Sequence, residues 1–353
     1  MVLGLRACGG IRLLSEAFEL RGTCMISVNP SRFGGPLEGF IGALLMGLVV
    51  CAWAQSYPVK PIRVVVPNPA GGIDAYARAF QPKFTEIIGQ QMVLENRPGA
   101  SGAIGAENIA KSPPDGYSLL FATSAVLVTS PFLNKSLPYD PVRDFAPICN
   151  LLEPVDLIAI SAFQPFRTVR ELIDFAKANP GKLTFGSSGV GSVPHFDGEL
   201  FKSAAGVDML HVPFKGIAQI IPELVAGRID VSFPGMGSIG PHAASGKARI
   251  LAVLGATRFA RLPEVPSITE TLPGFRPAPL WFGMFAPAAT PRPIVQRLHA
   301  VFVASLNAPE VRAHYESGGF RVIASTPEEL AARMRADTEL TAGLIKAVGL
   351  KPE

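Results

Sequence analysis

Short apolar runs of strand length alternate with helical patterns through almost the whole chain. The runs are Ile62–Val66, Met92–Leu94, Ser118–Ala122, Leu157–Ile160, Leu183–Phe185, Met209–Val212, Ile229–Phe233, Ile250–Leu254 and Trp281–Phe285. Helix signals lie between them: Thr168 and Glu171 form a capping box that opens a helix over Val169–Ala178, and an Asn-Pro-Gly sequence ends it. Strands that alternate with helices at this spacing predict an α/β fold with parallel-type sheets flanked by helices.

The alternation of strands and helices is interrupted at two places. A chain of 353 residues fits about two domains. The first interruption lies at Leu151–Pro154 and the second in the Pro-rich segment Leu262–Pro279. Helices then open at Thr290-Pro291 and Thr326-Pro327. A helical tail after two boundaries suggests that one domain interrupts another. We expect residues 55–154 and 276–353 to form domain 1, and residues 155–275 to form domain 2.

Residues 1–54 are interpreted as a cleaved signal peptide. The apolar run Phe40–Ala52 is too short to span a bilayer comfortably, and the following Ala-Trp-Ala sequence predicts cleavage before Gln55. The 24 residues before Met25 are unusual for such a signal, so Met25 is an alternative start. A lipoprotein signal ending at Cys51 is a second alternative, disfavoured because a bulky valine precedes the cysteine. The third alternative is that the apolar run forms a buried core helix.

Several functional classes lack the residues that they require. Lys and Arg number 32 against 28 Asp and Glu, without a basic run, so nucleic acid is not an expected partner. Cys149 is the one cysteine after the leader, which excludes an internal disulfide. The chain has no HExxH, GxSxG or P-loop sequence, and the glycines of Gly99–Gly105 follow a polar segment instead of leaving a strand. We therefore expect no metal, no cofactor and no catalytic activity.

Two glycine-bearing loops remain as candidate anion sites. The first glycine loop, Pro67–Asp74, follows a strand and opens a helix, so its backbone N–H groups are available to an anion. The alternative is an ordinary turn capped by Asp74. The second glycine loop, Phe185–Ser192, repeats this chemistry in the other predicted domain, with Ser192 as the expected cap of the next helix. Its alternative is a flexible turn. The candidate residues of the two loops are Asn68, Ala70, Gly71, Gly72, Asp74, Ser188, Gly189, Gly191 and Ser192.

Four further polar residues are weaker candidates. Thr123 and Ser124 lie at the C-terminal end of a predicted strand, where open α/β sheets bind ligands. His195 is either a ligand contact or a hydrogen-bonded structural residue, and Lys215 is either an anion contact or a solvated lysine. A small ligand held between two loops of different domains indicates an extracytoplasmic solute-binding protein that closes about a hinge.

The sequence after the leader resembles, over nearly its whole length, the Bug-type solute receptors of tripartite tricarboxylate transporters. The matching stretches are Tyr57–Pro67, Glu95–Glu107, Pro114–Leu120, Leu137–Pro147, Val207–Gly216 and Trp281–Pro287. The resemblance implies a two-domain Venus-flytrap protein of the periplasm that passes a small carboxylate to the membrane permease subunits of a transporter. We expect the protein itself to be a monomer. It also implies that Asn68 to Asp74 hold a ligand carboxylate, with Ser188 to Ser192 contributing from the second domain.

The chain departs from the family pattern in two places. Its first glycine loop is one small residue short, in the sequence Ala70-Gly-Gly-Ile-Asp74. Pro234 stands where many relatives carry Asp or Asn. The sequence leaves the ligand's identity open, and it leaves two other functions as alternatives: a periplasmic enzyme acting on a small acid, and a sensor subunit that presents its ligand to a membrane kinase.

Overall fold

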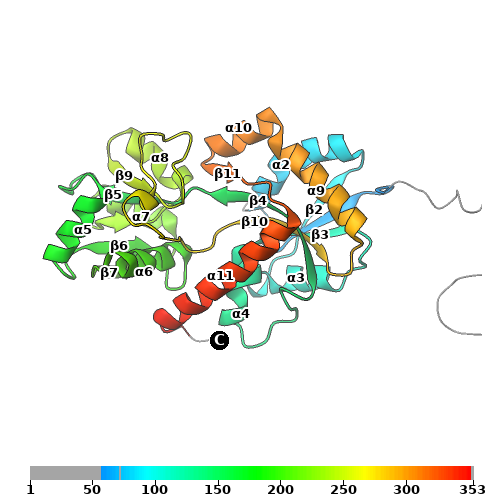
Figure 1. Cartoon of the computed structure of the whole chain (residues 1–353), viewed down its shortest axis with the longest axis horizontal. Helices are drawn as coiled ribbons and strands as arrows, with labels where there is room; N and C mark the ends of the chain where they lie inside the picture. The colour runs from blue at the N-terminus through cyan, green and yellow to red at the C-terminus, as the bar shows by residue number, and fades with distance from the viewer. Residues whose placement is uncertain (1–56, 71–72, 351–353) are drawn as a thin grey trace, which may run out of the picture. The chain divides into compact units, whose positions relative to one another are not determined.

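The computed structural model describes residues 57–70 and 73–350, and Figure 1 shows their arrangement. The strands form two sheets, with the orders β11-β4-β10-β3-β1-β2 and β7-β6-β8-β5-β9. The strands are β1 (Ile62–Val66), β2 (Met92–Asn96), β3 (Ser118–Thr123), β4 (Phe145–Pro154), β5 (Leu157–Ser161), β6 (Thr184–Ser187), β7 (Leu210–Pro213), β8 (Val231–Ser232), β9 (Ala248–Val253), β10 (Phe282–Pro287) and β11 (Phe320–Val322). The helices are α2 (Asp74–Ile88), α3 (Ala103–Ala110), α4 (Ser130–Leu133), α5 (Val169–Ala178), α6 (Val193–Ala205), α7 (Ile217–Val225), α8 (Met236–Ala244), α9 (Arg292–Asn307), α10 (Pro309–Ser317) and α11 (Pro327–Ala347). The α/β fold class is confirmed.

Both sheets are mixed, with a parallel part where helices connect the strands. In the first sheet β1 pairs in parallel with β2 and β3, and in the second β6 pairs in parallel with β7 and β8. The first strand after each connection between the sheets is antiparallel to its neighbours: β10 to β3 and β4 in the first sheet, and β5 to β8 and β9 in the second. The chain passes from β4 of the first sheet to β5 of the second through Val155 and Asp156 alone.

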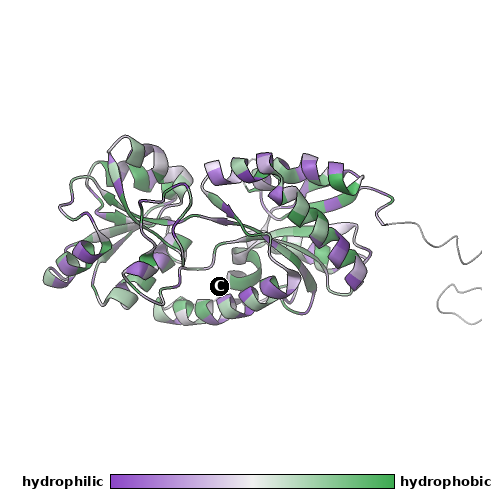
Figure 2. Ribbon diagram, turned by 45° about the horizontal axis from the view of Figure 1, so that its top comes forward, coloured by the Kyte–Doolittle hydropathy of each residue, from purple (hydrophilic) through white to green (hydrophobic). Residues whose placement is uncertain are grey.

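Continuous apolar strands supply the core of each sheet. Val64, Val65 and Val66 of β1 have no exposed surface, and every residue of β5 is buried. Figure 2 shows hydrophobic strands in both sheets, while the helices carry hydrophobic and hydrophilic residues together. This pattern is typical of sheets that helices cover on both faces.

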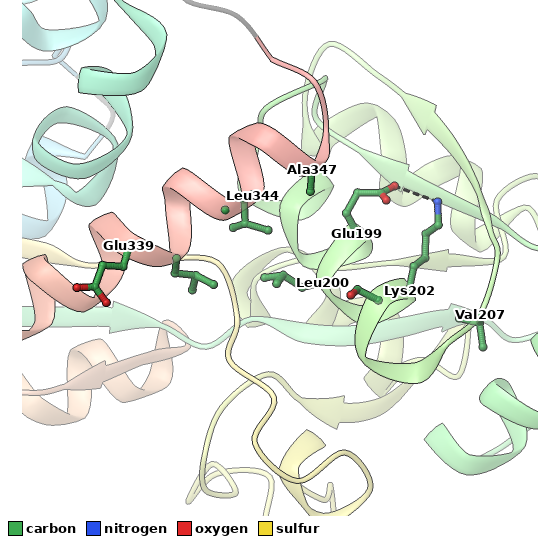
Figure 3. Close-up of a pocket in the computed structure, with 10 residues that line it drawn as sticks. Glu199, Leu200, Lys202, Val207, Glu339, Leu344 and Ala347 are labelled. Carbon is green, nitrogen blue, oxygen red and sulfur yellow. Dashed lines mark hydrogen bonds and ion pairs between the residues drawn. The ribbon is translucent and has the colours of Figure 1, made fainter.

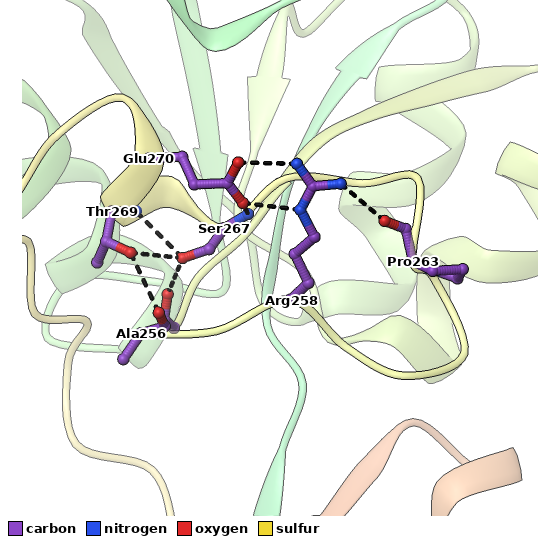
Figure 4. Close-up of polar contacts among 7 residues, drawn as sticks. Ala256, Arg258, Pro263, Ser267, Thr269 and Glu270 are labelled. Atoms are coloured by element: carbon purple, nitrogen blue, oxygen red, sulfur yellow. Dashed lines mark hydrogen bonds and ion pairs between the residues drawn. The ribbon is translucent and has the colours of Figure 1, made fainter.

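The return from β9 to β10 runs through the Pro-rich segment, which polar contacts organise (Figure 4). The guanidinium of Arg258 donates from Nε and Nη2 to the two carboxylate oxygens of Glu270, both at 2.8 Å. Its Nη1 donates to the Pro263 carbonyl at 2.8 Å, and the Ser267 N–H donates to Glu270 at 2.8 Å. These bonds fix the irregular backbone that leads back to the first sheet.

Helix α11 contacts residues of both sheet layers. Leu330 and Met334, in its first half, belong to the core around β3 and β10. Leu344 and Ile345, near its end, pack in a separate cluster with Phe196 of α6. Figure 3 shows the ends of α6 and α11 lining a shared pocket, where the Lys202–Glu199 ion pair of α6 lies across from the apolar side of α11.

By their internal contacts Pro58–Glu353 group as one unit, and the predicted division into domains 55–154 plus 276–353 and 155–275 stays a prediction. Within the described ranges, no helix combines the length and the apolar character that a membrane span needs. The predicted leader and its cleavage site lie outside the described residues.

Candidate functional site

The first glycine loop connects β1 to α2. Pro67 is buried, and the main-chain carbonyl of Asn68 accepts a hydrogen bond from Asn96 at 3.0 Å. The side-chain oxygen Oδ1 of Asn68 is buried and has no partner among the described residues. Ala70 is exposed, while Gly71 and Gly72 lie outside the described residues. A buried amide oxygen without a partner is unusual, which marks this loop as a place where a further group is needed.

Asp74 is the first residue of α2 and is 2% exposed. Arg78 donates from Nε to its Oδ2 at 3.1 Å. The cap position is occupied by Ile73, whose side chain makes no cap hydrogen bond within the described part of the chain. The expected cap by Asp74 is therefore wrong, although its charge near the helix N-terminus is favourable.

Ser124 has a structural partner at the end of β3. It is 1% exposed, its hydroxyl donates to the Pro279 carbonyl at 2.9 Å, and its N–H donates to the Trp281 carbonyl at 3.1 Å. Ser124 thereby attaches the returning segment to the first sheet. Thr123 pairs with Phe282 across the same strands. Their predicted ligand contacts stay predictions.

The second glycine loop forms most of its hydrogen bonds within itself. The Gly189 N–H donates to Ser187 Oγ at 3.2 Å, and the Ser192 hydroxyl donates to the Gly189 carbonyl at 2.6 Å. Ser192 occupies the cap position of α6, but its side chain accepts no hydrogen bond from the helix, so the expected Ser192 cap is wrong. Gly189 and Gly191 have φ of +112° and +82°, a conformation that favours glycine.

His195 and His211 contact this loop from α6 and β7. The Gly191 N–H donates to His195 Nδ1 at 3.0 Å, and Ser187 Oγ lies 2.6 Å from His211 Nε2. The two imidazoles stack with ring centroids 4.1 Å apart. The structural interpretation of His195 thus has a specific partner. The sequence analysis includes Ser187 in the second glycine loop but missed its pairing with His211, which a serine at the end of one strand and a histidine on the next strand along the chain could have suggested.

Two acids lie at the connections between the sheets, and sequence reasoning missed both. Asp156 separates β4 from β5, and Asp197 of α6 accepts the Ala278 N–H of the returning segment at 2.7 Å. Asp197 has no exposed surface, and its Oδ2 has no hydrogen-bond partner within the described chain. Burial raises the pKa of Asp156 to about 7. Burial and then the nearby charge of Asp156 raise the pKa of Asp197 well above its ordinary range. The available sequence signal was the position of Asp156 directly before the apolar run Leu157–Ile160.

The remaining candidate residues make fewer side-chain contacts. Lys215 is exposed, and its N–H donates to Gln219 Oε1 at 3.1 Å. Pro234 is buried, and its carbonyl accepts the Leu157 N–H at 3.0 Å. No hydrogen bond of the described residues joins the two glycine loops, so their action on one ligand stays a prediction. In the same ranges, no group of three or more His, Cys, Asp or Glu could hold a metal ion.

The family model and the related proteins that match this chain point to the same family. The family described as the tripartite tricarboxylate transporter family receptor matches residues 76–350. A Pseudomonas protein named for the tcbD-tcbE intergenic region is 38% identical over 288 residues, covering 81% of this chain and 85% of that protein. BugT of Bordetella pertussis is 30% identical over 309 residues, covering 86% and 94%.

Solved structures agree. The adipate-bound structure of an R. palustris protein has a TM-score of 0.68 at 30% identity, covering 84% of this chain and 100% of that one. MatC of Rhodopseudomonas palustris, with bound malate, has a TM-score of 0.63 at 28% identity, covering 82% and 100%. With the family match over most of the chain and the Bug-type relative, the chain belongs to the receptor family of tripartite tricarboxylate transporters and is of the Bug type.

Proposed function

We propose that this chain is a periplasmic receptor that binds a small carboxylate at its two glycine loops and delivers it to the permease subunits of a tripartite tricarboxylate transporter. One structural observation carries the proposal. Helices α2 and α6 follow strands of different sheets, and neither has a side chain that caps its first turn. Most described α-helices share this feature, since only Thr168 and Thr326 cap theirs, so what distinguishes α2 and α6 is the glycine loop before each of them. Uncapped N-terminal N–H groups that follow glycine loops are suited to a carboxylate.

The family supports the ligand class. Its members include proteins whose solved structures hold adipate and malate, two small dicarboxylates. We propose that Asn68 to Asp74 bind one carboxylate. Ser188 and Val190 are the better donors of the second loop, because the N–H groups of Gly189 and Gly191 already have partners in it. The proposal also includes residues that shape the site: Ala70, Gly71, Gly72, Thr123, Ser124, Ser192 and His195.

The ligand should lack an amino group near its carboxylate. Pro234 offers neither a charge nor an N–H, so it cannot pair with an α-ammonium as Asp or Asn could. We expect succinate or glutarate to bind more tightly than aspartate or glutamate. Calorimetry showing the amino acids tighter by tenfold, about 1.4 kcal/mol, would overturn this preference.

The decisive experiment uses residues 55–353 as one protein. Mass spectrometry of small molecules released from it should identify a carboxylate, and calorimetry should then measure the affinity for succinate, glutarate, adipate and malate. Binding without loss of ligand over hours, followed by NMR, supports a receptor. Consumption of the ligand would instead establish the enzymatic alternative, and failure of every carboxylate to bind would reject the proposal.

Substitutions then locate the site. Gly72→Val should weaken binding roughly thirtyfold, about 2 kcal/mol, because a branched side chain blocks close backbone approach. We propose that the Ser188 hydroxyl bonds the carboxylate beside the backbone N–H groups, so Ser188→Ala, which keeps the N–H, should cost about 1 kcal/mol of binding free energy. Ser203→Ala, an exposed serine on α6, is the matched control and should leave the affinity unchanged. Near-native affinity in a folded Gly72→Val protein would remove the first glycine loop from the site.

A further inference from the structure

The shape of the second glycine loop depends on two imidazoles. A backbone N–H can only donate, so the 3.0 Å bond from Gly191 requires an unprotonated Nδ1 on His195. On the other side of the loop, His211 Nε2 lies 2.6 Å from the hydroxyl of Ser187, which itself accepts the Gly189 N–H. Each histidine therefore fixes a different glycine of the loop.

The surroundings favour neutral rings. His195 is 6% exposed, and its ring stacks on His211 at a centroid distance of 4.1 Å, where two cations would repel. Burial first, then His195 and Lys202, lower the pKa of His211 to about 4, while Glu199 acts in the opposite direction. Burial also lowers the pKa of His195, with Lys202 adding to the effect and Glu199 opposing it. Lys202 and Glu199 form an ion pair at 3.2 Å, so their influences largely cancel.

We propose that His195 and His211 are positioning residues for the second glycine loop, and that His195 holds it in its ligand-accepting shape only while its imidazole is neutral, so that protonation of His195 releases the loop and weakens ligand binding. The inference rests on the proposed function for its ligand. Protonated His195 loses the lone pair that accepts the Gly191 N–H, and that N–H must then turn away from the ring. Because burial lowers the pKa of His195, the neutral ring persists below pH 6.5, and the loop is released only as the pH falls further.

Two variants of His195 separate the role of its acceptor atom from the role of its ring volume. In His195→Asn the amide oxygen can replace Nδ1, whereas His195→Phe keeps a flat ring without an acceptor. His314→Asn, an exposed histidine on α10, is the matched control. Calorimetry with adipate from pH 7.5 to pH 3.5 should show the wild-type affinity falling roughly threefold or more beyond the fall seen in His195→Asn, because the titration of adipate itself affects both proteins equally. His195→Phe should bind weakly at pH 7.5.

A measurement without ligand separates this inference from the proposed function. In the unliganded wild-type protein, the amide nitrogen and proton of Gly191 should shift in the NMR spectrum along the titration curve of the imidazoles. In His195→Asn this shift should be absent, and in His314→Asn it should persist. If adipate and the other carboxylates fail to bind at any pH, the proposed function is rejected, and the Gly191 titration still decides the positioning role. A Gly191 amide that does not respond to pH, or equal pH profiles of binding in wild type and His195→Asn, would overturn the inference.

Discussion

Replacing Asp156 with asparagine should stabilise the protein at neutral and alkaline pH. The side chain lies at the direct connection from β4 to β5, keeps only part of its surface exposed, and has a pKa raised by burial from 3.8 to about 7. Folding at pH 8 must therefore keep a carboxylate charged where the protonated form is preferred. Taken for Asp156 alone, this shift sets an upper limit of roughly 4 kcal/mol, and Asp156→Asn would also remove the charge that raises the pKa of Asp197.

The expected gain is smaller than this limit. Asp156 retains contact with solvent, and an asparagine amide needs partners of its own, so we expect Asp156→Asn to add about 2 kcal/mol to the free energy of unfolding at pH 8. That corresponds to a rise in Tm of about 4 °C for a protein of this size. The main-chain carbonyl of Asp156, which accepts the Leu254 N–H at 2.8 Å, is unaffected by the change.

The pH dependence has a definite sign. The folded protein binds a proton at Asp156 up to about pH 7, whereas the unfolded chain releases it near pH 4, so wild-type stability falls as the pH rises through this window. The advantage of Asp156→Asn should be full above pH 7 and vanish near pH 4. Urea denaturation at pH 4.5, 6 and 8 measures it, with the exposed Asp174→Asn of α5 as the control. A variant no more stable than wild type at pH 8, or equally advantaged at pH 4.5, would refute the reasoning.

Three further outcomes are expected. Gly105→Ala should destabilise the fold by about 1–3 kcal/mol in urea denaturation, because a Cβ there would lie 2.8 Å from Pro67 Cβ; an unchanged midpoint would contradict the packing. Asp337→Ala should cost about 3 kcal/mol and alter tryptophan fluorescence, since the buried Trp281 indole N–H donates to Asp337 at 2.9 Å; native emission would argue against that bond. Intact-mass analysis of the exported protein should show an N-terminus at Gln55, and any other terminus would reject the predicted cleavage.

The regular elements were predictable where local signals agree with the tertiary structure. The helix Val169–Ala178 begins and ends as the Thr168 capping signal and the Asn-Pro-Gly stop predict, and β1 has the predicted bounds. The strand β4 was missed because its two prolines and its polar residues interrupt the apolar run. The sheet accommodates Pro147 beside a register shift in the pairing of β4 with β10, a feature that only the neighbouring strand determines.

The internal contacts of the site were not predictable from local sequence. The Gly191 N–H was expected to donate to a ligand. It donates instead to His195, which lies next to the loop in the first turn of α6. His211 reaches the same place from a separate strand, and Asp197 meets the returning segment at Ala278, far along the chain. Such pairs form only when the sheets are assembled, so a pattern of residues indicates which loops bind an anion but not which of their N–H groups remain available.

The position of the end of α11 also determines how the protein should be produced. A Cβ at Gly191 would lie 3.2 Å from Leu350 Cδ1, so the last described residue of the chain contacts the second glycine loop. A purification tag attached after Glu353 would begin only a few residues from that loop, with histidines and charges of its own beside the proposed anion site. It would compete for the carboxylate or for the imidazole network in every titration. A removable tag placed before Gln55 avoids this interference.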